Sequence, residues 1–227
     1  EQGSESITTL EKTGEPVEVR VKNKIAFATT GGRSLNSAKQ TVILIHGAGM
    51  DHTVWLLQTR YFAHYGYNVL AIDLPAHGRS QGPACETITD MADWVIELLD
   101  SLSISRVSMV GHSMGSLVAL DLASRYPGRV EVLVMMGVAV PMVVSEKLLA
   151  TAKKNDHGAI DLITMWGHAR FARIGGNQSP GLWMNAMSER LLERASVGVL
   201  YRDLKACSEY HDGLEAASKF CNPAFLI

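Results

Sequence analysis

The pattern of apolar and polar positions along the chain predicts short buried strands separated by helices. Residues 41–45 and 68–72 are almost continuously apolar, which is typical of strands buried on both faces of a parallel sheet. Residues 107–110 and 130–136 have the same character, and residues 223–227 begin what is expected to be another buried strand. Together these segments predict a mostly parallel central sheet.

The segments outside these runs have different periods. Val17, Val19 and Val21 alternate with charged residues, which predicts a half-exposed strand that turns into a second strand at residues 25–29. Residues 54–65 and 87–101 instead repeat their apolar positions at helical spacing. Strands that alternate with helices indicate an α/β fold in which right-handed crossovers place helices on both faces of the sheet.

The alternation of strands and helices stops between residues 141 and 199, where no strand pattern occurs. Short helical pieces are expected at residues 145–154, 159–166 and 181–194, with a loop at 175–180. We interpret this region as a helical lid inserted after the sixth strand.

The proposed division of the chain is therefore a core at residues 1–140, the cap at 141–199 and a return to the core at 200–227. The returning part is expected to contain one long amphipathic helix at residues 201–220.

Composition limits the possible functions. The chain has 227 residues, is 47% hydrophobic and carries a net charge of −2 without a basic run, so nucleic-acid binding has no electrostatic support. The longest apolar stretch, residues 130–144, is interrupted by Gly137 and Pro141, and no membrane association is expected. Three scattered cysteines without metal spacing predict free thiols in a reducing, cytoplasmic compartment.

Candidate chemistry is concentrated where the strand at residues 107–110 turns into a helix. The turn reads Gly111-His112-Ser113-Met114-Gly115. So sharp a reversal holds its apex, Ser113, in a strained conformation, and the flanking glycines are needed where strand and helix approach too closely for a β-carbon. The alternative is an ordinary strand-to-helix turn with a surface serine.

Two further motifs follow neighbouring strands. His46-Gly47-Ala48-Gly49 comes directly after the strand at 41–45, and Asp73-x-x-x-His77-Gly78-x-Ser80 comes after the strand at 68–72. Loops at the carboxyl ends of parallel strands are where open α/β sheets bind ligands. We therefore expect all three motifs to meet at one edge of the sheet.

These three motifs, in this order, resemble the α/β-hydrolase fold family, and more narrowly its esterases, lactonases, cofactor-free haloperoxidases and carbon–carbon bond hydrolases with a helical cap. The resemblance implies that Ser113 is a nucleophile and that the backbone N–H groups of Ala48 and Met114 form an oxyanion hole. It implies no cofactor and no metal ion. The remaining motif residues are expected to shape the site: His46, Gly47, Gly49, Gly111, His112 and Gly115.

Other polar residues of the motifs have less direct roles in this interpretation. His46 is expected to organise its loop by hydrogen bonding, and His77 and His112 are treated in the same way. Asp73 is expected to form a turn rather than to serve as the acid of a triad. Ala76 stands where the family usually has glycine, a mild departure without a clear chemical meaning.

A larger departure concerns the base that Ser113 needs. In the family, the acid follows the seventh strand and the histidine follows the eighth, so both are expected beyond Ile227 and the chain is interpreted as C-terminally truncated. His211 with Asp203 or Asp212 is the alternative inside the chain, disfavoured because it sits on a helix away from the loops. His157 and His168, in the lid, could at most touch substrate.

The resulting functional prediction is a serine hydrolase that cleaves a small carboxylic ester or lactone through an acyl-enzyme on Ser113. Large apolar side chains in the lid favour a small hydrophobic ester-like substrate, although they could equally hold the lid on the core: Met165, Trp166, Phe171, Trp183, Met184 and Met187. The alternatives are a non-catalytic binding protein of the same fold, and a cofactor-free haloperoxidase or carbon–carbon bond hydrolase that uses the same site. Epoxide and haloalkane hydrolysis are disfavoured because they require a carboxylate at the position of Ser113.

Overall fold

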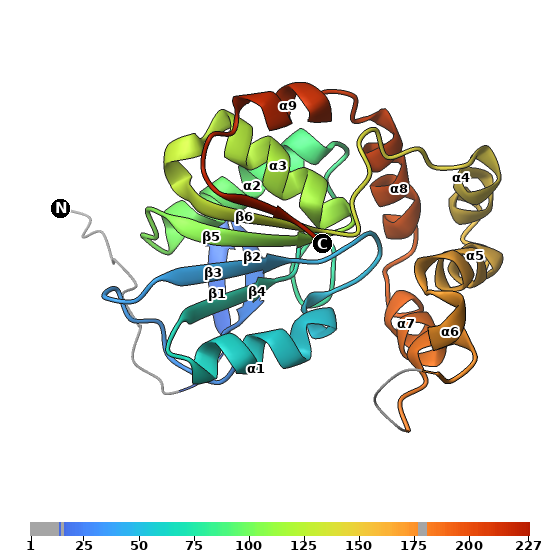
Figure 1. Cartoon of the computed structure of the whole chain (residues 1–227), viewed down its shortest axis with the longest axis horizontal. Helices are drawn as coiled ribbons and strands as arrows, with labels where there is room; N and C mark the ends of the chain where they lie inside the picture. Colours follow the sequence, from blue (N-terminus) through green and yellow to red (C-terminus); the bar gives the residue numbers. More distant parts are fainter. Residues whose placement is uncertain (1–13, 15, 177–180) are drawn as a thin grey trace.

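The computed structural model describes residues 14, 16–176 and 181–227, and it has a mostly parallel seven-stranded sheet in this part of the chain (Figure 1). The strands lie in the order β1-β2-β4-β3-β5-β6-β7. Their bounds are β1 Val17–Val21, β2 Lys24–Thr29, β3 Thr41–Ile45, β4 Asn68–Ile72, β5 Val107–His112, β6 Val130–Met136 and β7 Ala224–Leu226. The predicted α/β fold class is confirmed.

The pairing of the strands follows the sequence pattern. The alternating β1 forms an antiparallel hairpin with β2, and β2 pairs antiparallel with β4. The continuously apolar β3 and β4 lie in the middle of the sheet, where all ten of their residues are buried. From β4 to β7 the neighbouring strands are parallel, so their carboxyl ends share one edge.

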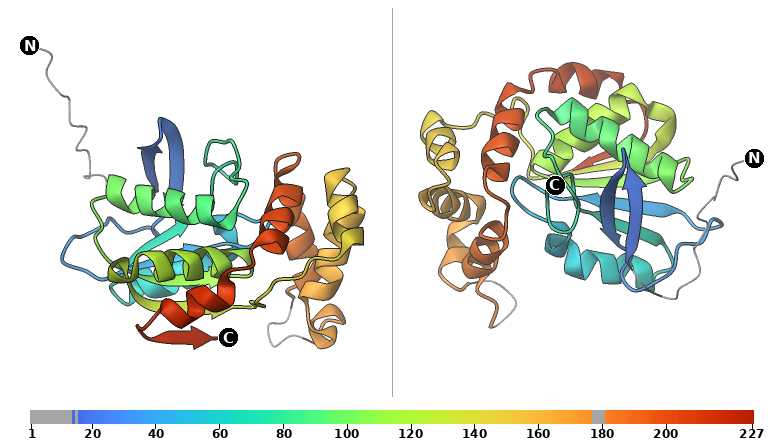
Figure 2. Two further views of the ribbon diagram at one scale, coloured as in Figure 1. Left: turned by 90° about the horizontal axis from the view of Figure 1, so that it is seen from above. Right: turned by 180° about the vertical axis from the view of Figure 1, so that it is seen from behind.

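Helices cover both faces of this sheet (Figures 1 and 2). On one face a short 3₁₀ turn, His52–Trp55, leads into α1, Leu56–His64, and packs on Val42, Leu44 and Val69. The other face carries α2, Ile88–Ser101, and α3, Met114–Arg125, within the largest apolar cluster. Nearly all of α3 is buried, which fixes the start of this helix firmly against the sheet.

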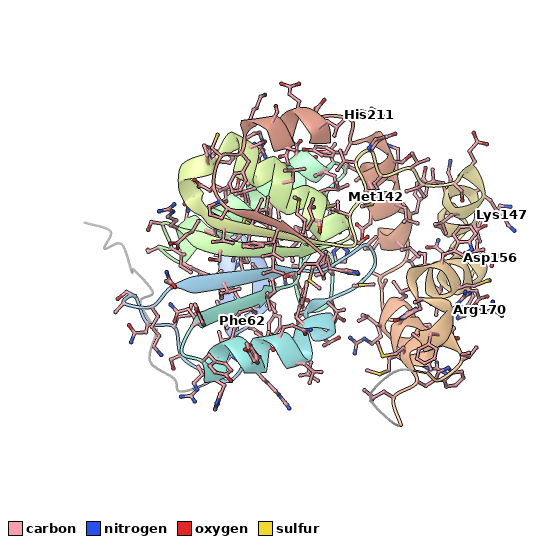
Figure 3. All side chains as sticks on the ribbon, in the orientation of Figure 1. Phe62, Met142, Lys147, Asp156, Arg170 and His211 are labelled. Carbon is pink, nitrogen blue, oxygen red and sulfur yellow. The ribbon has the colours of Figure 1, made fainter. Side chains whose placement is uncertain are left out.

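A helical segment lies beyond the carboxyl ends of the parallel strands (Figures 1 and 2). It consists of α4 Glu146–Lys153, α5 Gly158–Gly167, α6 Arg170–Arg173 and α7 Met184–Leu192. Lys147, Asp156 and Arg170 mark its course in Figure 3. The loop expected at 175–180 lies largely outside the described residues. We refer to α4–α7 as the cap.

One long helix was predicted at residues 201–220, and this prediction is wrong. The structure has two helices there, α8 Val199–Glu209 and α9 Gly213–Lys219, which meet at a turn. The turn lets both helices pack against α3 and keeps the ring of Tyr210 buried, with its hydroxyl donating to Asp121 at 3.2 Å. A single straight helix over these residues could not place both of its halves against α3.

The last strand also differs from its prediction. Residues 223–227 were expected to form a buried strand, but all three residues of β7 are exposed. In the described part of the chain β7 pairs only with β6, so it forms the edge of the sheet, where its apolar side chains remain uncovered. Among the described helices, none combines the length and the hydropathy needed to cross a bilayer.

Candidate active site

Ser113 sits at the apex of the tight turn that joins β5 to α3. Its backbone has φ 51° and ψ −117°, a conformation that residues other than glycine rarely adopt. Its N–H donates to the carbonyl of Met136 on the neighbouring strand β6 at 2.8 Å. The surrounding sheet and helix therefore hold a strained residue at the carboxyl edge of the sheet.

The two glycines of the turn are required by close contacts between main-chain atoms. A β-carbon at Gly111 would overlap the carbonyl of Gly115, and a β-carbon at Gly115 would overlap the carbonyl oxygens of Ile45 and His46. Both obstacles are backbone, which cannot move aside as a flexible side chain could. The glycine spacing in the sequence is thus explained by steric contact.

The hydroxyl of Ser113 is available for chemistry. It makes no hydrogen bond to any described residue, and it is not among the buried polar atoms that lack a partner, so solvent can reach it. His112, beside it, is partly buried, and its ring meets that of Trp55 edge-on at 6.4 Å between centroids. Burial lowers the pKa of His112, which favours the neutral imidazole.

The loop at residues 46–49 lies directly against this turn. A β-carbon built on Gly47 would come within 3.3 Å of the β-carbon of Ser113. In the described part of the chain, the N–H groups of Ala48 and Met114 donate no hydrogen bond to a protein acceptor. One unengaged amide therefore lies on the loop that packs against the Ser113 turn, and the other lies at the start of α3, directly after Ser113 in the chain.

His46 holds this loop by its ring nitrogens. Its Nδ1 lies 2.9 Å from the carbonyl oxygen of Gly47, and its Nε2 accepts the N–H of Leu74 at 3.1 Å. Complete burial, and next the charge of His77, lower the pKa of His46 to about 4. The ring is thus neutral and carries its hydrogen on Nδ1, where it donates to Gly47.

Asp73 organises the loop after β4. Its carboxylate is fully buried and accepts the N–H groups of His52 at 2.7 Å and Arg79 at 2.8 Å, while Nδ1 of His52 lies 2.9 Å from Oδ1. All these contacts fix turns, and none reaches Ser113. No sequence pattern indicated the partnership with His52, which lies earlier in the chain, at the start of the 3₁₀ turn that precedes α1.

His77 has a partner that sequence reasoning missed. Its Nε2 lies 2.8 Å from Oδ2 of Asp203, on α8, and its Nδ1 lies 3.0 Å from the carbonyl of Pro75. Burial alone would lower the pKa of His77, but the Asp203 carboxylate raises it above the ordinary value. Because both ring nitrogens face acceptors, the ring carries two hydrogens and forms a buried ion pair with Asp203.

The grouping of His211 with Asp203 is absent from the structure. Asp203 is buried beside His77, whereas His211 is exposed at the junction of α8 and α9 (Figure 3). The helix turns between these residues, so their side chains do not meet. Within the described residues no histidine hydrogen-bonds to Ser113, and the position of the base and acid beyond Ile227 stays a prediction.

The cap histidines are occupied elsewhere. His157 pairs with Glu193 at 3.0 Å, and His168 lies 3.0 Å from the hydroxyl of Ser188. His157, Glu189 and Glu193 form one of two groups of possible metal ligands in the described residues, and this group is mostly exposed. The other comprises Asp51, His52 and Asp73, whose carboxylates already accept hydrogen bonds from the backbone and from side chains.

The comparison with protein families agrees with this geometry. The model of the alpha/beta hydrolase fold matches residues 40–199, which is well over half of the chain. The chain therefore belongs to the alpha/beta hydrolase fold family.

Two of the curated relatives that the chain matches are hydrolases. The chain is 37% identical to the (E)-2-((N-methylformamido)methylene)succinate hydrolase of Acinetobacter baylyi over 93 residues, covering 40% of this chain and 35% of that protein. It is 38% identical over 106 residues to the 2-hydroxy-6-oxononadienedioate/2-hydroxy-6-oxononatrienedioate hydrolase of Paraburkholderia phymatum, covering 44% of this chain and 37% of that protein. The matches thus span little more than a third of either relative.

Solved structures resemble the chain over most of its length. The enol-lactonase of Burkholderia xenovorans superimposes with a TM-score of 0.75 at 20% identity, covering 92% of this chain and 80% of that one. A thermophilic esterase gives a TM-score of 0.72 at 25% identity, covering 93% and 76%. At 20% identity the first likeness shows the fold alone.

Proposed function

We propose that the protein is a serine hydrolase that cleaves a small carboxylic ester or lactone through an acyl-enzyme on Ser113. In this reaction the Ser113 oxygen attacks the carbonyl carbon and gives its proton to a base. The carbonyl oxygen becomes an oxyanion, and when the carbonyl reforms the alkoxide leaves and takes the proton back from the base as an alcohol. Water then hydrolyses the acyl-serine, releasing the acid and restoring the hydroxyl.

The observation that carries this proposal is the free Ser113 hydroxyl, with one unengaged backbone amide at the next residue, Met114, and another at Ala48 on the loop that packs against the turn. Main-chain N–H groups are rigid, and those of Ala48 and Met114 would stabilise the oxyanion without reorganising. Loss of one such donor typically costs about 3–4 kcal/mol of transition-state stabilisation. Met114 also begins α3, so the positive end of the helix dipole favours a negative charge at the same place.

The cap supports an apolar substrate. Several of its large side chains are exposed rather than packed into the core, with exposed fractions from 45% to 67%: Met165, Trp166, Phe171, Trp183 and Met187. Exposed apolar side chains in a cap beyond the carboxyl edge of the sheet, the edge at which Ser113 lies, suit a hydrophobic acyl or ring group (Figure 1). We therefore propose a small hydrophobic ester or lactone rather than a charged substrate.

Carbon–carbon bond hydrolysis is the second candidate function. It is favoured by the 38% identity to the Paraburkholderia phymatum hydrolase, although that match covers 37% of the relative. Such a reaction would use the same serine and the same amides. The two candidates are separated by their substrates, since an ester hydrolase turns over a p-nitrophenyl ester series efficiently and a carbon–carbon bond hydrolase prefers a vinylogous diketone.

The decisive experiment is labelling of the full-length protein with a fluorophosphonate, followed by mass spectrometry of the modified peptide. We expect the label on Ser113 and none on Ser113→Ala. Ser124→Ala is the matched control, because Ser124 lies on α3 and its hydroxyl bonds to the carbonyl of Asp121. Equal labelling of the parent and Ser113→Ala would remove the catalytic assignment and leave the non-catalytic binding protein as the better interpretation.

A further inference from the structure

Asp203 is a buried acid that the proposed reaction does not use directly. It lies on α8, its side chain is fully buried, and its Oδ2 receives both of its hydrogen bonds. One comes from Nε2 of His77 at 2.8 Å and the other from the N–H of Gly49 at 2.7 Å. The second oxygen, Oδ1, is buried without a partner among the described residues.

The unpartnered oxygen indicates what Asp203 is for. A buried carboxylate oxygen that accepts no hydrogen bond costs free energy, so this arrangement is poorly optimised for stability alone. Departures of this kind are expected where function constrains a residue. What Asp203 does achieve is a link between α8 and the loop that follows β3.

Gly49 is the point at which this link acts. It directly follows Ala48, it has φ 67°, and a β-carbon there would lie 2.9 Å from Cδ1 of Leu200 on α8. Ala48 itself makes no hydrogen bond to the described protein. The direction of the Ala48 amide therefore depends on its neighbours, with His46 bonded to Gly47 on one side and Asp203 bonded to Gly49 on the other.

We propose that Asp203 is a positioning residue for the reaction at Ser113, because its carboxylate, held by His77, fixes the main chain at Gly49 and thereby the direction of the Ala48 N–H. This inference rests on the proposed function. The next residue of α8, Leu204, packs with Leu148, Ala152 and Ala159 of the cap. Asp203 consequently connects the placement of the cap to the oxyanion-binding amide.

The test is the kinetics of p-nitrophenyl butyrate hydrolysis by full-length protein carrying Asp203→Asn. A carboxamide can accept the N–H groups of Gly49 and His77 through one oxygen only if its NH₂ group takes the place of Oδ1. No described acceptor faces that buried position, so the carboxamide is expected to shift. A displacement of a reacting group by about 1 Å can cost ~100-fold in rate. We expect kcat to fall by ~10- to 100-fold with KM changed less than about threefold, since only the transition state carries the oxyanion.

Asp121→Asn is the matched control, because it also removes a buried carboxylate but has no contact with the loop. Asp121 bonds to Arg125 and Tyr210 within the core. At a temperature where circular dichroism shows both variants folded, Asp121→Asn should retain the kcat of the parent. An unchanged kcat in Asp203→Asn, or an equal fall in both variants, would overturn the positioning role while leaving the proposed function intact.

The failure of the proposed function has a different signature. A parent protein that neither hydrolyses the ester nor labels at Ser113 would overturn the hydrolase assignment, and the positioning role with it. If the parent protein labels at Ser113 and hydrolyses the ester, an unchanged kcat in Asp203→Asn overturns only the positioning role of Asp203. The two outcomes are read from separate samples and cannot be confused.

Discussion

Gly115, the second residue of α3, lies directly against the carbonyl oxygen of Ile45, the last residue of β3. A β-carbon at Gly115 would overlap that oxygen and also the carbonyl of His46. The contact presses the start of α3 onto the loop that carries Ala48. The turn at Ser113 and the loop at Ala48 are therefore held together by a close contact that only glycine allows at this position.

The first prediction concerns this contact. Gly115→Ala should destabilise the protein by more than about 3 kcal/mol or prevent folding, because two backbone segments would have to separate. Gly128→Ala is the control, since a β-carbon at Gly128 meets nothing within 4 Å. The measurement is urea unfolding followed by tryptophan fluorescence. A Gly115→Ala variant as stable as Gly128→Ala would show that the packing of α3 on β3 is looser than described.

The second prediction concerns the strain at Ser113. A non-glycine residue at φ 51°, ψ −117° costs roughly 1–3 kcal/mol, whereas glycine there gives up roughly 0.4–1 kcal/mol through greater freedom of the unfolded chain. The free energy of unfolding of Ser113→Gly should therefore be about 1 kcal/mol higher than that of the parent. Ser113→Ala keeps the strain and should stay within about 0.5 kcal/mol of the parent.

Both Ser113 variants should fail to react with a fluorophosphonate, so the gain in stability would be separated from the loss of chemistry. If Ser113→Gly and Ser113→Ala were equally stable, the turn would store no strain. Stability is read from denaturant unfolding at neutral pH, where the four tryptophans of the chain report on the transition.

The turn at Ser113 was predictable from the sequence because its causes are local. A strand period, a helix period and two glycines four residues apart define the turn at Ser113, and the same reasoning placed the loop at Ala48 after β3. The pair formed by His77 and Asp203 was not predictable, because the two residues are 126 positions apart and no short pattern connects them. Their meeting depends on the path of α8 after the cap.

Ala76 shows a similar limit. The sequence marked it only as a departure from glycine, whereas the structure gives it φ 67°. That value explains the glycine of the family, since glycine adopts this region without steric cost. The backbone angle, which composition and periodicity do not encode, supplies the missing physical meaning.

The third prediction follows from this angle. The left-handed conformation costs alanine roughly 1–2 kcal/mol, and glycine loses roughly 0.4–1 kcal/mol through the unfolded chain, so Ala76→Gly should stabilise the protein by about 0.5–1 kcal/mol. Ala38→Gly is the control, because Ala38 is an exposed loop residue without positive φ and should lose stability. The comparison is made by thermal and urea unfolding. A destabilised Ala76→Gly would mean that its methyl group contributes more through packing than its backbone costs.

The last prediction concerns stability in acid. The folded pKa of His46 is about 4, below its unfolded value of about 6.5, so the unfolded state binds more protons between these pH values. The contribution of His46 is fully present above pH 6.5 and is lost as the pH falls towards 4, amounting to about 3 kcal/mol. His46→Gln keeps an acceptor for the N–H of Leu74, and its unfolding free energy should fall less than that of the parent between pH 6.5 and pH 4. His112 acts in the same direction and should leave part of the slope in place. Unfolding free energies between pH 7 and pH 4 measure the effect. An unchanged slope in His46→Gln would mean that folding does not lower the pKa of His46.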